Sequence, residues 1–305
     1  MNAVPAEPTR TEALRDEPLS RHTSWRVGGP ADRFYTPASV PELQGILAEL
    51  AATTPIYWLG LGSNLLVRDG GIRGAVIATA GLPRELVRVD ETHVRASAGL
   101  ACMLLAKRCV RWQLGPAAFF AGIPGTVGGA LAMNAGAFGG ETWTHVESVT
   151  TIDRRGKVRE RPRAEFEIGY RTVRVPANEC FLSATFRFEH DEASSMGAIK
   201  EMLARRNAAQ PLGVPSCGSV FRNPEGDFAG RLIEQAGMKG RRIGGAMVAE
   251  KHANFILNLG SATAADIEAL IGEVRVAVER VSGVHLELEV RVVGEPGAPV
   301  AGEQS

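Results

Sequence analysis

Two glycine-rich segments offer main-chain amides to a ligand with little interference from side chains. The first, LGLGSNLL at residues 59–66, fails the GxGxxG pattern because Leu65 replaces the third glycine, and it lacks the GK[ST] of a P-loop. Its two glycines and two polar side chains are nevertheless suited to binding a diphosphate. A tight connection between two strands is the alternative. The candidate ligand-contacting residues are Gly60, Gly62, Ser63, Asn64 and Leu65.

The second segment, AGIPGTVGGA at residues 121–130, is followed by MNAGAFG at residues 133–139. Its glycines allow close approach of a ligand, and a helix beginning near Thr126 would direct its first N–H groups at an anion. No charged residue occurs from Trp112 to Gly140. We therefore expect amides and a helix dipole to hold an anion here, with a flat, largely apolar ring system beside it. A close-packed glycine turn is the alternative.

Three polar positions could do chemistry. Arg171 supplies a planar fork for a carboxylate. Ser219 lies in SCGSVFRNP, where Gly218 favours a tight turn that presents the hydroxyl. Glu289 lies in LELEVR, where the alternation of a strand would place it on one face with Glu287 and Arg291. Taken singly, each position is better explained without chemistry, as a surface arginine, a turn serine and a solvated strand face.

The composition excludes several classes of function. Among 305 residues, 34 Lys and Arg balance 34 Asp and Glu, which argues against a general nucleic-acid binder. Four cysteines without CxxC spacing and six scattered histidines predict reduced thiols and no metal site. The N-terminus has no apolar signal region. Pro116 and Pro124 interrupt the longest uncharged stretch, so we expect no membrane segment and a cytoplasmic protein.

Periodicity predicts an α+β pattern rather than regular βαβ alternation. We expect a flexible tail at residues 1–19, a first domain at 20–200 made of subdomains 20–80 and 81–200, a second domain at 201–294 and a flexible tail at 295–305. Helices are expected at 39–52, 100–113, 195–209, 227–236 and 263–283. Strands are expected at 55–59, 65–67, 74–79, 86–89, 92–97, 146–153, 157–161, 180–189, 245–249, 255–258 and 286–293.

Seven segments occur in one order: WLGLGSNLLV, AGIPGTVGGALAMNAGAFGGE, GYRT, PSCGSVFRNP, LIEQAGMKG, KHANFILN and LELEVR. This ordered set, from Ser20 to Gly294, closely resembles the UDP-N-acetylenolpyruvoylglucosamine reductases (MurB family), the flavoproteins of peptidoglycan precursor synthesis. The resemblance implies a non-Rossmann FAD-binding domain of the vanillyl-alcohol oxidase kind (PCMH-type), followed by a smaller α+β substrate-binding domain.

The resemblance also implies site residues. It implies non-covalent FAD and catalytic roles for Arg171, Ser219 and Glu289. Residues in motifs that line the substrate pocket are Asn223, Gln235, Lys239 and Arg291. Residues implied to contact FAD are Gly60, Gly62, Ser63, Asn64, Leu65, Gly122, Ile123, Pro124, Gly125, Thr126, Gly128, Gly129, Asn134, Ala135 and Gly136.

The implied reaction has two half-reactions. NADPH reduces FAD and leaves, and the enolpyruvyl ether of UDP-N-acetylglucosamine then enters the same pocket. Flavin N5 delivers hydride to C3, and the negative charge at C2 spreads into the carboxylate. Arg171 and Glu289 suit its stabilisation, with Glu289 either protonated or bridged by water or a cation. Ser219 donates a proton to C2, which gives UDP-N-acetylmuramate.

The sequence departs from the family pattern at two points. Leu288 stands where LEPEV has proline, and only 47 residues separate Arg171 from Ser219, which leaves no room for the inserted tyrosine loop of some members. Two other functions compete with the reductase. One is an FAD-dependent sugar or alcohol oxidase of the same superfamily, which would need neither Ser219 nor Glu289. The other is a nucleotide-sugar-binding regulator without catalysis. The sequence makes no prediction about oligomeric state.

Overall fold

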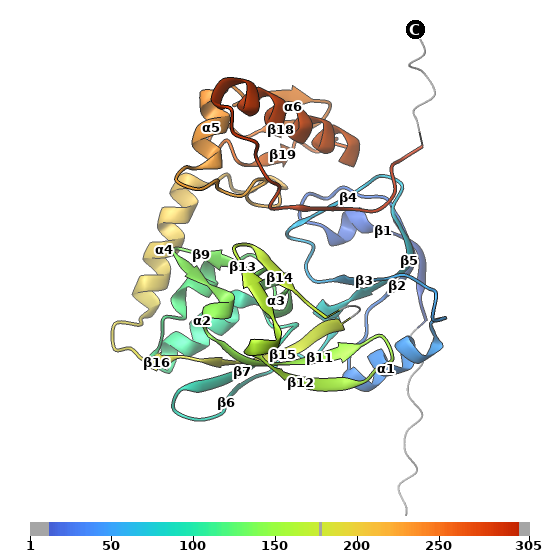
Figure 1. Cartoon of the computed structure of the whole chain (residues 1–305), viewed down its shortest axis with the longest axis vertical. Coiled ribbons are helices and arrows are strands. Elements are labelled where there is room, and N and C mark those ends of the chain that lie inside the picture. The colour runs from blue at the N-terminus through green and yellow to red at the C-terminus, as the bar shows by residue number, and fades with distance from the viewer. Residues whose placement is uncertain (1–11, 177–178, 299–305) are drawn as a thin grey trace, which may run out of the picture. The chain divides into compact units, whose positions relative to one another are not determined.

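In the computed structural model, which describes residues 12–176 and 179–298, the chain forms two units made of several segments each (Figure 1). Among the described residues, the first unit contains 12–14, 33–60, 75–176 and 179–203, and the second contains 15–32, 61–74 and 204–298. The last division lies close to the expected boundary after residue 200. Residues 20–32 and 61–74, expected in the first domain, instead group with the C-terminal part of the chain, as do residues 15–19, which were expected in the tail.

A five-stranded antiparallel sheet, ordered β12-β11-β15-β7-β6, organises the first unit. Helices α2 (Cys102–Arg111) and α3 (Val127–Met133) pack on it through a core that includes Leu105, Leu131 and Phe186 (Figure 1). The strands are β6 (Leu86–Arg88), β7 (His93–Ser97), β11 (Val146–Asp153), β12 (Val158–Pro162) and β15 (Glu179–Arg187).

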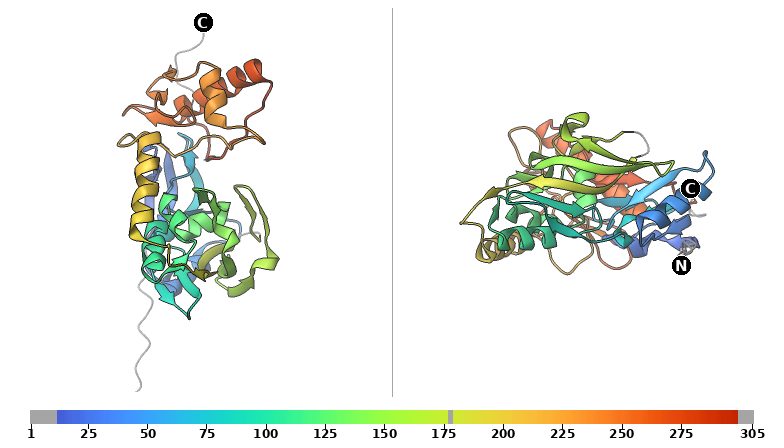
Figure 2. Two further views of the ribbon diagram at one scale, coloured as in Figure 1. Left: turned by 90° about the vertical axis from the view of Figure 1, so that its left-hand side faces the viewer. Right: turned by 90° about the horizontal axis from the view of Figure 1, so that it is seen from below.

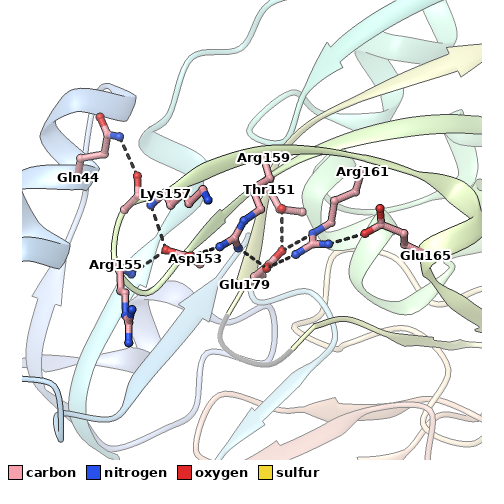
Figure 3. Close-up of polar contacts among 10 residues, drawn as sticks. Gln44, Thr151, Asp153, Arg155, Lys157, Arg159, Arg161, Glu165 and Glu179 are labelled. Carbon is pink, nitrogen blue, oxygen red and sulfur yellow. Dashed lines mark hydrogen bonds and ion pairs between the residues drawn. The ribbon is translucent and has the colours of Figure 1, made fainter.

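A cluster of charged side chains surrounds Glu179 on strands β11, β12 and β15 (Figure 3). The Glu179 carboxylate accepts hydrogen bonds from Thr151 Oγ1 (2.7 Å), Arg159 Nη1 (3.1 Å) and Arg161 Nη2 (2.6 Å). Arg159 also pairs with Asp153 at 3.0 Å. The side chain of Glu179 is only 4% exposed, so the cluster ties three strands together around one buried carboxylate.

A second group of elements in the first unit has its own core. Helix α1 (Val40–Glu49) is capped at its N-terminus by Ser39, whose hydroxyl accepts a hydrogen bond from the main-chain amide of Glu42 (3.2 Å). Its apolar face packs with Ala75 and Ile77. Strand β3 (Ile56–Leu59) pairs in parallel with β5 (Ile72–Ala78), and β5 and β2 (Pro30–Tyr35) each contain residues of both units.

Short elements complete the first unit. Strand β8 (Leu114–Gly115) pairs with β16 (Glu189–His190), β9 (Gly136–Ala137) with β10 (Gly140–Glu141), and β13 (Glu167–Gly169) with β14 (Thr172–Arg174). Helix α4 (Met196–Ala209) contains residues of both units.

In the second unit, helix α6 (Ala264–Ser282) packs beside α5 (Ala229–Gln235) and against a three-stranded sheet (Figure 2). The sheet contains β17 (Arg242–Ile243), β18 (Ala246–Val248) and β19 (Ile256–Asn258). Strand β4 (Leu65–Val67) pairs in parallel with β20 (Arg291–Val293). The Arg68–Glu268 ion pair (2.7 Å) and the contacts of Asp69 with the first amides of α6 explain why residues 61–74 group here.

The structure corrects two expectations. Leu14–Pro18 forms strand β1, so the expected flexible tail does not reach residue 19, and the part of it at residues 1–11 lies outside the described residues. Likewise, Glu295 exchanges main-chain hydrogen bonds with Gly70 and Gly71, and only residues 299–305 of the C-terminal tail lie outside the description.

The final strand is also shorter than expected. Only Arg291–Val293 forms β20, because residues 287–290 pair with residues 220–222 through an isolated bridge and irregular hydrogen bonds. The expected alternation nevertheless persists in the burial of this segment, because Leu286 and Val290 are buried while Glu287 and Arg291 are exposed.

Candidate functional site

The two glycine-rich segments meet in the first unit. Gly60 follows β3, and Thr126 caps the N-terminus of α3. A Cβ atom on Gly60 would lie 3.5 Å from Thr126 Oγ1. The Gly125 carbonyl accepts the first amide of α2 from Cys102 (3.0 Å), which fixes the loop. Pro124 and Gly129 stay exposed on its surface. The sequence-predicted loops thus form one surface of accessible main chain beside Gly60.

The N-terminus of α3 does not offer its amides as expected. Val127 N donates to Leu100 O (2.8 Å), Gly128 N to Ala98 O (2.8 Å) and Gly129 N to the capping hydroxyl of Thr126 (3.3 Å). These three donors are therefore used inside the protein, and the expectation that they would be aimed at an anion is wrong. A Cβ on Gly128 would meet Ala98 Cβ at 2.8 Å, so close packing explains this glycine.

Asn134 is buried at the C-terminus of α3 with a left-handed φ of 49°. Its side-chain amide donates to Glu141 Oε2 (2.9 Å) and Gly169 O (3.1 Å), and its Oδ1 accepts the amide of Trp143 (3.0 Å). This predicted FAD-contacting side chain therefore joins α3 to the β13–β14 hairpin and to the segment after β10.

Arg171 lies in the turn between β13 and β14, also with a left-handed φ of 53°. Its guanidinium donates to the carbonyl oxygens of Asn134 (3.3 Å) and Gly136 (3.0 Å). The guanidinium carbon also lies 5.1 Å from the centre of the Tyr170 ring. The structure thus brings Arg171 together with the predicted Asn134-Ala135-Gly136 segment.

In the second unit, the rest of the first glycine segment meets the LELEVR segment. Asn64 Nδ2 donates to Glu289 O (3.0 Å), and Arg291 N donates to Asn64 O (3.0 Å). Leu65 pairs with Arg291 in the β4–β20 ladder. Gly62 has φ 62°, and a Cβ there would lie 2.1 Å from His22 O, so only glycine fits.

Ser219 and Glu289, far apart in sequence, lie on neighbouring segments of the second unit. Glu289 N donates to Val220 O at 2.9 Å, directly after Ser219. Phe221 and Leu288 form an antiparallel bridge. Gly218 adopts φ 74°, which confirms the expected turn before Ser219. Arg171 belongs to the first unit and these two residues to the second.

The remaining candidates cluster around α5. Asn223 Oδ1 accepts the amide of Ala229, the first residue of α5 (3.1 Å). Gln235 Oε1 accepts from Arg231 Nη1 (2.9 Å). Lys239 Nζ pairs with Glu234 at 2.7 Å. Each of these side chains therefore has an internal partner that holds it near α5.

The described part of the chain also bears on thiol chemistry, metal binding and membrane insertion. All four cysteines are free and buried, which confirms the expected thiols, and burial raises the pKa of each thiol to about 12. Within residues 12–176 and 179–298, no cluster of His, Cys, Asp and Glu could hold a metal ion. Over the same residues, no helix is both long and apolar enough to cross a membrane.

Comparison with known proteins identifies the family. Residues 210–293 match the model of the UDP-N-acetylenolpyruvoylglucosamine reductase C-terminal domain, and residues 31–161 match an FAD binding domain. The reductase of that name from Alkalilimnicola ehrlichii is 56% identical over 92% of this chain and 94% of its own. The chain belongs to the UDP-N-acetylenolpyruvoylglucosamine reductase (MurB) family.

Two further relatives cover nearly the whole chain. The UDP-N-acetylenolpyruvoylglucosamine reductase of Methylococcus capsulatus is 54% identical over 96% of this chain and 97% of its own. The crystal structure of the Thermus caldophilus MurB is 34% identical, with a TM-score of 0.76 over 93% of this chain and 98% of that one. These likenesses confirm the expected fold class, an FAD-binding domain followed by a C-terminal domain.

The residues present fit an FAD cofactor. In the first unit Pro124 and Gly129 are exposed, Gly125 is half-buried, and Gly60 lies beside Thr126. A loop without charged side chains is compatible with a large, flat, apolar ring system. The Tyr170 ring, 45% exposed, adds a further apolar surface next to Arg171.

Proposed function

We propose that this MurB-family chain catalyses the NADPH-dependent reduction of UDP-N-acetylglucosamine enolpyruvate to UDP-N-acetylmuramate. The observation that carries the proposal is the 56% identity to a reductase of this name over 92% of the chain. The FAD binding domain match at residues 31–161 supports FAD as the cofactor. When bound, FAD supplies hydride chemistry between NADPH and the enolpyruvyl carbon.

The proposed cofactor contacts fall into three groups. The accessible main chain around Gly125 and Gly129 would lie against FAD together with Gly60. Gly62, Ser63, Asn64 and Leu65 would contribute from the other part of the first glycine segment. Asn134 and Gly136 would contribute mainly by positioning Arg171, whose guanidinium donates to their main-chain carbonyl oxygens. No covalent attachment is proposed.

Three side chains are proposed to perform the chemistry on the substrate. Arg171 would stabilise the negative charge that develops on the substrate carboxylate, because its position is fixed by two carbonyl oxygens and its charge is permanent. Ser219 would donate the proton to C2 from the turn that follows Gly218. Glu289, next to this turn, would stabilise the same charge in a protonated or bridged form.

The remaining assignments concern substrate and location. Asn223, Gln235, Lys239 and Arg291 are proposed to bind the UDP-sugar. The substrate is a small molecule, and the zero net charge gives no support for nucleic-acid binding.

We propose a cytoplasmic location because NADPH and UDP-sugars are cytoplasmic metabolites. The functional domain boundaries at 20–200 and 201–294 remain a proposal alongside the observed units.

Absorption spectroscopy under anaerobic conditions tests the reaction. Purified protein should show an oxidised flavin spectrum, lose it on addition of NADPH, and regain it on addition of the enolpyruvyl substrate. Reoxidation by oxygen only, coupled to a sugar or alcohol as electron donor, would instead indicate an oxidase. Protein that stays colourless after addition of FAD would indicate a nucleotide-sugar-binding regulator.

A further inference from the structure

Asn254 is buried in the KHANFILN segment, and the sequence gives it no role of its own. Its side chain is bound at both ends to one residue: Oδ1 accepts from Phe221 N (2.9 Å) and Nδ2 donates to Phe221 O (2.8 Å). Its main-chain carbonyl also accepts from Val220 N (2.9 Å). Three hydrogen bonds therefore fix the two residues that follow Ser219.

The same short segment is held on its other edge by the residues around Glu289. Val220 O accepts from Glu289 N (2.9 Å) and from Val290 N (3.3 Å), and Arg222 N donates to Glu287 O (2.9 Å). Residues 220–222 thus lie between Asn254 and the Glu289 segment. Any shift of Phe221 moves Ser219 through the chain and Glu289 through the hydrogen bonds to Val220.

Asn254 is itself held by His252. The main-chain amide of Asn254 donates to His252 Nδ1 (3.3 Å), and the main-chain amide of Phe255 donates to His252 O (3.0 Å). Burial lowers the pKa of His252, and the charge of Lys239 lowers it further. A neutral ring keeps Nδ1 available as an acceptor, which matches this hydrogen bond.

We propose that Asn254 is a positioning residue for the protonation step, because it sets the place of Ser219 and Glu289 together. The inference rests on the proposed function, in which those two side chains act on the substrate. An amide suits this task because one group offers both a donor and an acceptor to the two ends of Phe221. A carboxylate lacks the donor, and a serine hydroxyl is too short to reach both ends.

The test is Asn254→Asp, studied by stopped-flow in each half-reaction. Reoxidation by the enolpyruvyl substrate should slow by about 10–10² at about pH 8, as expected for a misplaced catalytic group. Reduction by NADPH should change by less than about twofold, because it needs no proton from Ser219. Lowering the pH protonates the introduced carboxyl, which then donates to Phe221 O. The deficit in the reoxidation rate, measured against the parent at the same pH, should therefore be smaller at about pH 6 than at about pH 8.

Asn258→Asp is the matched control. Asn258 is also buried, and its Nδ2 donates to the main-chain oxygen of Trp25 (2.9 Å) while Oδ1 accepts from Gly260 and Ala262. The control loses the same type of donor in the same unit without touching residues 219–222. It should lower stability and leave the ratio of the two half-reactions unchanged.

Asn254→Ser is a second variant that tests the same role if Asn254→Asp does not fold. It should slow the substrate half-reaction selectively, and its deficit should not depend on pH, because serine introduces no titrating group in this range. Equal slowing of both half-reactions, or an Asn258→Asp variant with the same selective deficit, would overturn the positioning role. A deficit of Asn254→Asp that does not change with pH would also overturn it.

Ser219→Ala separates this inference from the proposed function. If Ser219→Ala slows the substrate half-reaction and the Asn254 variants do not, the positioning role fails and the assignment of Ser219 stands. If Ser219→Ala leaves that half-reaction unchanged, the assignment of Ser219 fails, and the positioning role that depends on it fails too.

Discussion

The guanidinium of Arg171 donates a hydrogen bond of 3.0 Å to the carbonyl oxygen of Gly136. Gly136 belongs to the glycine-rich segment that is proposed to contact FAD. A Cβ atom at Gly136 would lie 2.9 Å from Arg171 Nη1, so the glycine leaves room for this contact. The proposed catalytic cation and the proposed cofactor surface are therefore parts of one local structure in the first unit.

Arg171→Lys should impair the reaction of the reduced enzyme with substrate. Lysine keeps the charge but loses the planar fork that reaches the Asn134 and Gly136 carbonyl oxygens, so the cation is no longer fixed. We expect a decrease of about 10–10² in the rate of flavin reoxidation. Stopped-flow absorbance measures it directly.

Arg174→Lys is the control for this change, because Arg174 lies on β14 of the same hairpin and is 77% exposed in its pair with Glu167. It should react at the parental rate. If both variants slow the reaction equally, the effect comes from the hairpin and not from the fixed guanidinium.

Gly60→Ala should weaken FAD binding without destabilising the fold. The added methyl would meet Thr126 Oγ1 at an ordinary contact distance of 3.5 Å, and φ is not in the left-handed region. The methyl would however enter the surface where FAD is proposed to lie. An overpacking cost of about 1–3 kcal/mol corresponds to a roughly 5–150-fold rise in Kd. Fluorescence titration of the apoprotein with FAD measures it.

Gly45→Ala provides the comparison. Gly45 lies within α1 with open space around it, so alanine should raise the free energy of unfolding by about 0.5–1 kcal/mol and leave FAD affinity unchanged. Unaltered FAD affinity in Gly60→Ala would argue that the loop serves only as a connection between strands.

Local sequence patterns predicted most of the helices and strands. Thr263 and Asp266 form the expected capping box of α6, and Gly283 ends that helix with φ 71°. The observed strand β11 has the predicted ends, Val146 and Asp153. These elements were predictable because capping, turn chemistry and apolar periodicity act within a few residues.

Features that depend on distant contacts were not predictable in this way. The amides of Val127 and Gly128 looked available in the sequence, but the carbonyl oxygens of Leu100 and Ala98 accept them. Similarly, residues 287–290 look like a strand and instead pair with residues 220–222. Asn254 carried no signal by itself, because its partner Phe221 lies 33 residues away.

Glu179→Gln should destabilise the first unit. Burial alone would raise the pKa of Glu179, but hydrogen bonds from Arg161 and Thr151 and the charges of Arg161 and Arg159 lower it below the ordinary 4.5. The neutral amide loses charge-assisted hydrogen bonds and directs donors at the arginines. We expect a loss of about 1–3 kcal/mol in the free energy of unfolding near neutral pH, measured by urea denaturation.

The lowered pKa of Glu179 also predicts how its contribution to stability changes with pH. Because the folded-state pKa is lowered, the stabilisation by Glu179 is fully present above the unfolded value and is lost as the pH falls through the folded value. The difference in the free energy of unfolding between the parent and Glu179→Gln should therefore become smaller below about pH 4.5. Glu167→Gln, in an exposed pair with Arg174, should change stability by less than about 0.5 kcal/mol. A difference that persists at low pH would show that Glu179 acts through packing.

Ser219→Ala should separate the two half-reactions. Protonation of the substrate follows hydride transfer, so reduction by NADPH should stay near the parental rate. Reoxidation by the enolpyruvyl substrate should slow by the ~10²–10⁴ typical of a lost general acid. Cys217 cannot replace the hydroxyl, because it is buried, burial raises its pKa to about 12, and its thiol contacts the Leu65 carbonyl oxygen.

Ser216→Ala, three residues earlier in the same segment, is the matched control and should keep both rates. Equal slowing of both half-reactions in Ser219→Ala would indicate structural damage to the turn after Gly218. An unchanged second half-reaction would mean that another group supplies the proton, and the half-buried Glu289, which is hydrogen-bonded to the residue after Ser219, would be the next to replace. Glu289→Gln, measured in the same two half-reactions, then decides whether that carboxyl is the donor.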